Sequence, residues 1–153
     1  MRALATTTSQ RMPRPGIRAD VATAPLPDDR VAGTFRVADS ARAWITGSAP
    51  MAVVQVDSTA NLAVGSVSWG PGALGATVDE AEVPPGARVA VIGRGVGADH
   101  PAVGAVDRLR GAGHDVVLVE CGWPRGGADI ETFGGSPAVA RALLALLGNE
   151  VGR

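Results

Sequence analysis

A glycine-rich stretch is the first candidate for chemistry, because Gly93-Arg-Gly-Val-Gly-Ala98 has the G-x-G-x-x-G/A spacing of a dinucleotide-binding loop. It follows the apolar run Val89–Ile92, and Glu120 ends the next such run, where an acid would contact a ribose. However, Asp99-His100-Pro101 delays the helix start and puts a carboxylate near the phosphate position. Glu120 also lies 27 positions after Gly93, beyond the usual ~20. We therefore predict no dinucleotide or other cofactor, and keep a small nucleotide- or sugar-binding module as the alternative.

The histidines, the cysteine and the last serine each have a chemical and a structural interpretation. His100 stands beside Asp99, as a proton-transfer pair would, but it also stands where a helix cap belongs, which we favour. His114 is expected to be a solvated turn residue, and two separated histidines with one cysteine do not make a metal site. Cys121 would need a nearby base to act as a nucleophile, so we predict a small buried residue. Ser136 lacks the G-x-S-x-G spacing and is predicted to cap a helix.

Two tryptophans, Trp69 and Trp123, stand beside glycine and proline in predicted loops. An indole in such a place can stack on a sugar ring or dock against a partner. It can equally pack within its own loop. The sequence leaves these interpretations open.

These residues are positioned by a predicted βαβ unit. Val89–Ile92 and Val116–Val119 are short β-branched runs typical of strands buried on both faces. Between them, Pro101–Ala112 has apolar residues at helical spacing. Strand, crossover helix and strand predict a parallel pair.

The flanking segments extend this unit. We predict strands at Met51–Val56 and Ile130–Phe133, and helices at Phe35–Ile45 and from Pro137 to the stop at Gly148. Asn61–Trp69 is either a short strand or an ordered loop. The alternation predicts an α/β fold, a three-layer αβα sandwich with a mostly parallel sheet.

Ligands of such sheets bind at the carboxyl ends of the strands. We expect those ends at Asp57, at the loop from Gly93 to His100, and at Glu120–Arg125. No residue is assigned a catalytic role by motif. The predicted ligand- or partner-facing residues are Asp57, Asn61, Trp69, Arg94, Asp99, His100, Glu120, Trp123 and Arg125.

Composition excludes some partners and favours one compartment. The net charge of −1 gives no electrostatic reason to expect nucleic acid or anionic lipid. No apolar run approaches the ~20 residues that cross a bilayer. Neither a signal peptide nor a cysteine pair is visible, so we expect a cytoplasmic protein. Residues 1–30, rich in proline and poor in large apolar residues, are predicted to be a disordered arm before one domain at 31–153.

The order of the segments resembles the C-terminal α/β domain of bacterial glycoside hydrolase family 3, especially its actinobacterial β-N-acetylglucosaminidases. The resemblance rests on five stretches and covers about residues 31–148. They are 53–65, Trp69-Gly70, Val89–Gly93, Asp115–Pro124 and Thr132–Ser136.

The resemblance implies an accessory domain without its catalytic part. Members of this type carry their nucleophile and acid/base on a preceding TIM barrel, which needs ~250 residues. The chain has 153 residues, and no pair of groups for glycoside hydrolysis can be assigned by motif. The implied partners are a glycosidase barrel, a second copy, or an N-acetylglucosamine-type sugar. A protein-interaction domain is a further alternative.

Overall fold

The computed structural model describes residues 27–58 and 68–148. These residues form a five-stranded sheet in the order β1-β5-β4-β3-β2, in which β1 and β5 pair antiparallel and the other neighbours pair parallel. The elements along the chain are α1 (Asp28–Ala32), β1 (Arg36–Val37), α2 (Asp39–Ile45), β2 (Met51–Gln55), the 3₁₀ helices η1 (Gly70–Leu74) and η2 (Glu80–Glu82), β3 (Arg88–Gly93), α3 (Pro101–Gly111), β4 (Asp115–Glu120), β5 (Ile130–Glu131) and α4 (Pro137–Leu147).

The predicted βαβ unit is confirmed at the centre of this sheet. β3 and β4 pair in parallel from Arg88 opposite Asp115 to Gly93 opposite Glu120. Every residue of β3 is buried, which is why its run is apolar almost without interruption. α3 connects the two strands and packs against both of them.

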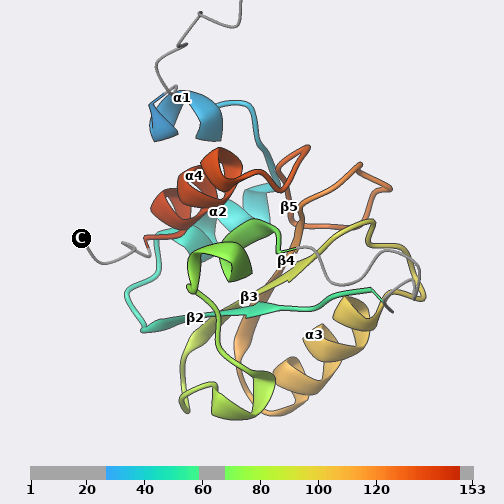
Figure 1. Ribbon diagram of the computed structural model, residues 1–153. Coiled ribbons are helices and arrows are strands. Elements are labelled where there is room, and N and C mark those ends of the chain that lie inside the picture. Colours follow the sequence, from blue (N-terminus) through green and yellow to red (C-terminus); the bar gives the residue numbers. More distant parts are fainter. Residues whose placement is uncertain (1–26, 59–67, 149–153) are drawn as a thin grey trace, which may run out of the picture.

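Helices cover both faces of the sheet, as Figure 1 shows, with α2 and α4 on one face and α3 on the other. The alternation of side chains along β3 separates two cores, since successive residues of a strand point to opposite faces. Ala90 and Ile92 pack with the leucines of α4 and with Trp44 of α2. Val89 and Val91 pack with the apolar side of α3. The α/β sandwich predicted from the sequence is therefore confirmed.

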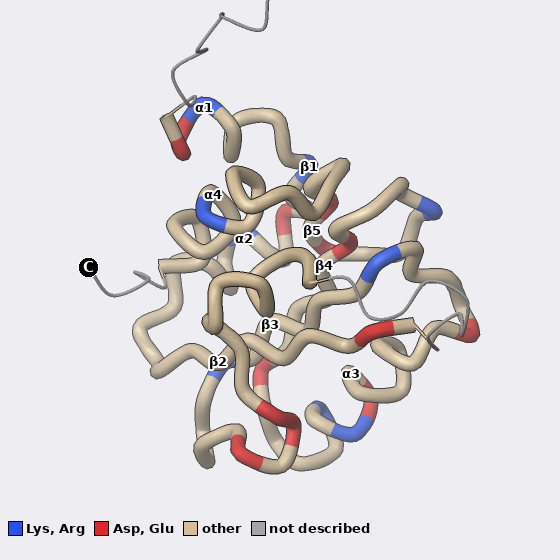
Figure 2. The backbone as a smooth tube through the Cα atoms, viewed as in Figure 1, with Lys and Arg blue, Asp and Glu red and all other residues tan. Residues whose placement is uncertain are grey.

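The charged positions of the described residues are visible along the backbone in Figure 2. Figure 2 shows acidic and basic positions scattered along the tube, without a face of one sign in the view. No helix within the described part of the chain is long and apolar enough to cross a membrane.

Several predicted element boundaries differ from the structure, and three of the differences are informative. The helix predicted at Phe35–Ile45 begins only at Asp39, because Arg36 and Val37 pair with β5 instead. β5 ends at Glu131, two residues before the predicted Phe133. The predicted arm overlaps α1, which begins at Asp28 and packs against α4. Residues 1–26 of the arm and the segment 59–67, which includes Asn61, lie outside the described residues.

Candidate functional site

Glu120 is the buried polar centre of the carboxyl edge. It ends β4 with 1% of its surface exposed, and three backbone N–H groups converge on its carboxylate. Oε1 accepts from Gly95 N at 2.8 Å and from Gly122 N at 2.5 Å, and Oε2 accepts from Val96 N. Successive backbone N–H groups in such a turn form a nest that binds anions. Here the anion is the chain's own carboxylate.

This geometry changes the interpretation of the glycine-rich loop. The N–H groups of Gly95 and Val96, which a pyrophosphate would need, already donate to Glu120. The start of α3 is closed as well, because His100 Nδ1 accepts from Ala102 N at 3.1 Å and Pro101 has no N–H. Both observations support the prediction that the loop holds no dinucleotide.

The predicted helix caps are confirmed. His100 is the N-cap of α3, and no hydrogen bond joins it to the exposed Asp99 within the described residues. His100 Nε2 is buried without a described partner. Ser136 caps α4 by accepting from Val139 N at 3.4 Å. Neither side chain is placed as an acid, a base or a nucleophile.

Asp57, Trp69 and Arg94 are brought together from three separate segments. Trp69 Nε1 donates to Asp57 Oδ1 at 2.7 Å, and the Arg94 guanidinium carbon lies 5.9 Å from the centre of the Trp69 ring. A hollow of about 310 Å³ borders this group. Gln55, which sequence reasoning missed, also lines it and accepts from Gly72 N at 2.8 Å.

Two further aromatic side chains leave the same edge of the sheet and face solvent. Trp123 is 83% exposed in the loop after β4, beside the exposed Arg125. Phe133, after β5, is 48% exposed and has a left-handed φ of 58°. The Arg36 guanidinium carbon lies 5.6 Å from its ring centre. The sequence did not indicate Phe133 as a candidate site residue. No local pattern distinguishes an aromatic residue with a left-handed φ from the last residue of a strand.

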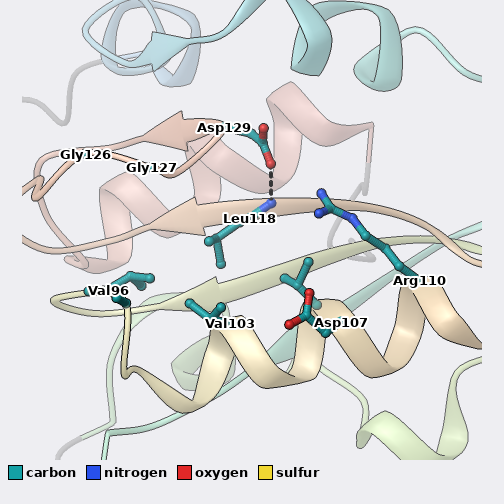
Figure 3. A pocket seen from close by; sticks show the side chains of 11 residues that line it. Val96, Val103, Asp107, Arg110, Leu118, Gly126, Gly127 and Asp129 are labelled. Atoms are coloured by element: carbon teal, nitrogen blue, oxygen red, sulfur yellow. Dashed lines mark hydrogen bonds between the residues drawn. The ribbon is translucent and has the colours of Figure 1, made fainter.

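A second hollow, which we call the flank hollow, lies between α3 and the loop before β5 (Figure 3). It has a volume of about 430 Å³. Part of its lining belongs to the glycine-rich stretch Gly93–Ala98. Its lining residues are Val96, Gly97, Ala98, Val103, Val106, Asp107, Arg110, Leu118, Gly126, Gly127 and Asp129.

Cys121 is buried, as predicted, and is chemically quiet. Desolvation raises the pKa of its thiol to about 11, so almost no thiolate is present near neutral pH. His114, predicted to be solvated, is instead half-buried, and its Nδ1 lies 3.0 Å from Ala87 O. That carbonyl belongs to the turn before β3, which the sequence could not place beside His114.

No set of three metal-ligating side chains gathers within residues 27–58 and 68–148. Comparison of the chain with family models, with curated proteins and with solved structures gave no match.

Proposed function

We propose that this chain is a non-catalytic accessory domain of the glycoside hydrolase type, which turns the carboxyl edge of its sheet toward an N-acetylglucosamine-type saccharide. The observation that carries the proposal is the exposed indole of Trp123 at that edge. A pyranose has an apolar C–H face, which packs on an aromatic ring whose other side faces solvent.

Polar groups near the indole suit the hydroxyl rim of a sugar. Gly122, next to Trp123, lies so close to Arg94 that a Cβ there would be 3.1 Å from its Cγ. Arg94 in turn lies over Trp69, whose indole binds Asp57. The loop that carries Trp123 thus borders Arg94, and Arg94 and Asp57 together offer both donors and acceptors to hydroxyls.

Two carboxylates of this edge, those of Glu120 and Asp57, already accept hydrogen bonds from the protein itself. Glu120 accepts three backbone hydrogen bonds, and Asp57 accepts the Trp69 N–H. Hydrolysis of a glycoside needs two groups that flank the scissile bond and are free to move a proton or to attack. A catalytic pair would therefore come from a partner barrel, for which this edge is the facing surface.

The test is calorimetric titration of the full chain with an N-acetylglucosamine oligomer. We expect saturable binding that Trp123→Ala abolishes, while Trp123→Phe, which keeps an aromatic platform, retains part of it. The same protein should not turn over an aryl β-N-acetylglucosaminide. Turnover that disappears in Glu120→Gln, without loss of folding, would replace the accessory role with a catalytic one.

A parallel titration with dinucleotides tests the alternative function, that of a nucleotide-binding module. With Gly95 N and Val96 N bonded to Glu120, we expect no saturable heat from NAD, NADP or FAD. Binding of one of them, lost in Gly95→Val, would favour that module over the saccharide. If neither the oligomer nor a dinucleotide bound, the proposal that this edge binds a saccharide would be wrong.

A further inference from the structure

The flank hollow exists because β5 is short. β5 pairs only with Val119 and Glu120 at the end of β4. Earlier along β4, Arg110 and Asp129 take the place of a neighbouring strand in the described structure, and Asp129 N donates to Leu118 O at 2.9 Å. Asp129 Oδ2 accepts from Leu118 N at 2.8 Å, and Arg110 donates to Val116 O at 3.1 Å. The edge is thereby blocked against another strand, while the space beside it stays open.

The hollow has one apolar side and one charged end. Val96, Val103 and Leu118 supply the apolar side, and Figure 3 shows Val96 away from the charged side chains. Asp107 and Arg110 approach from two turns of α3, and Asp129 approaches from the loop before β5. No ion pair joins these three side chains to any other described residue, so they keep unused hydrogen-bonding capacity.

Charge decides which class of ligand fits. Two carboxylates outweigh one guanidinium, and this excess repels phosphate and other anions. A hydroxyl, by contrast, can donate to a carboxylate and accept from a guanidinium at once. The hollow therefore favours a neutral ligand with several hydroxyls and one apolar face.

We propose that the flank hollow binds a neutral sugar ring, either a free monosaccharide or the ribose of a nucleoside. The ring places its C–H face against Val103 and Leu118 and its hydroxyls toward Asp107, Arg110 and Asp129. The volume of about 430 Å³ lies within the range of small-molecule pockets. This site is separate from Trp123 and does not require the saccharide proposed for the carboxyl edge.

The experiment follows backbone amide shifts of the isotopically labelled full chain during titration. The probes are N-acetylglucosamine, adenosine and cyclohexanol, the last being a ring without the array of hydroxyls. We expect saturable shifts at Val103, Asp107 and Leu118 with a Kd on the order of 1 mM for at least one sugar. A response to adenosine alone identifies a nucleoside, and a response to N-acetylglucosamine identifies a free sugar.

Matched variants locate the binding. Asp107→Asn changes an exposed side chain, and Asp129→Asn keeps an oxygen that can accept from Leu118 N, so both should fold. Each should weaken binding about tenfold, because a charged acceptor is lost. Ala98→Trp, on the exposed loop, should fill the hollow and abolish binding. Trp123→Ala should leave these shifts unchanged, which distinguishes this site from the carboxyl edge.

Several outcomes would overturn the proposal. These are the absence of saturable shifts with both sugars, equal binding of cyclohexanol, and binding that survives both Asp107→Asn and Ala98→Trp. Saturable binding of inorganic phosphate at the same amides would contradict the argument from charge. Melting temperatures of all variants show whether a loss of binding reflects a loss of folding.

Discussion

Two arginine–tryptophan pairs stand at opposite ends of β3 and are built differently. At the amino end, the Arg88 guanidinium carbon lies 4.8 Å from the centre of the Trp44 ring. Arg88 donates to Trp44 O and, at 3.1 Å, to Ala49 O, and Trp44 Nε1 donates to Asp115 O at 3.0 Å. Trp44 is only 5% exposed. Arg88 Nε, Arg88 Nη1 and Trp44 Nε1 thus all donate to backbone carbonyls.

At the carboxyl end, Arg94 lies over a half-buried Trp69, whose N–H donates to the side chain of Asp57. A backbone carbonyl is fixed by the fold, whereas a carboxylate on the surface can release its donor to a ligand. The same pair of residue types therefore closes the core at one end and leaves an adaptable surface at the other. Residue type alone does not tell these roles apart, but the partner of each polar group does.

We expect the largest effect from a substitution that breaks the amino-end pair of Arg88 and Trp44. Trp44→Ala should lower the free energy of unfolding by about 3–5 kcal/mol, because it empties a buried aromatic site and leaves Arg88 without its ring. Trp69→Ala should cost about 1–2 kcal/mol, since its ring is already partly solvated. Denaturant unfolding of both variants measures the difference. Equal losses would remove the distinction between the two ends.

The next effect concerns the anion nest at the carboxyl end. Glu120→Gln should lower the free energy of unfolding by about 1–3 kcal/mol, because an amide presents only one acceptor oxygen to three N–H donors. Asp57→Asn is the control, since its amide oxygen still accepts from Trp69. It should change stability by less than about 0.5 kcal/mol. A larger loss in the control than in Glu120→Gln would contradict the structural role of Glu120.

A smaller effect appears at alkaline pH. Burial raises the pKa of Cys121 from 9.0 to about 11, so the unfolded state releases this proton first. The stabilisation is complete below pH 9 and is lost as pH rises toward 11, by about 1 kcal/mol at pH 10. Cys121→Ala should show a flatter stability profile between pH 8 and 10 than the wild type. Identical slopes would mean that the thiol ionises freely in the folded protein.

The smallest effect returns to the amino end, where Glu80 and Arg108 form two hydrogen bonds of 2.8 Å at the surface. The side-chain hydrogen bonds from Arg108 lower the pKa of Glu80. The resulting stabilisation is present above the ordinary pKa of 4.5 and is lost as pH falls through the lower folded value. Glu80→Gln should slightly reduce the acid dependence of the melting temperature. A change as large as that of Glu120→Gln would be unexpected for an exposed pair.

Local sequence signals were enough to predict the central strands and helices of the fold. They were insufficient to predict the short elements at its margins. Pro101 and Ser136 marked helix starts, and the β-branched runs marked β3 and β4, because these choices depend on nearby residues. β1 was missed, since Arg36 becomes a strand only by pairing with Glu131, 95 residues later. A pattern that extends over two residues also carries no detectable period.

The candidate site was predicted by its position more than by its chemistry. The carboxyl-edge rule placed Asp57 and Arg94 at one edge of the sheet, and the structure has Trp69 between them. It could not reveal that Glu120 turns inward to the loop amides, because that depends on the φ angles of the glycine-rich loop. The glycine-rich loop supplies one side of the flank hollow, but the other side depends on where β5 begins, so the loop alone could not predict it.

The bond between Arg36 and Glu131 has a consequence for synthesis on the ribosome. β1 is made early but finds its pairing partner only after almost the whole domain has been translated. The core leucines of α4, Leu143, Leu144 and Leu147, emerge later still. Because domains fold as units, a nascent chain stopped before α4 would expose the apolar face of β3 and β4. We therefore expect the domain to complete its fold only after its last helix has left the exit tunnel.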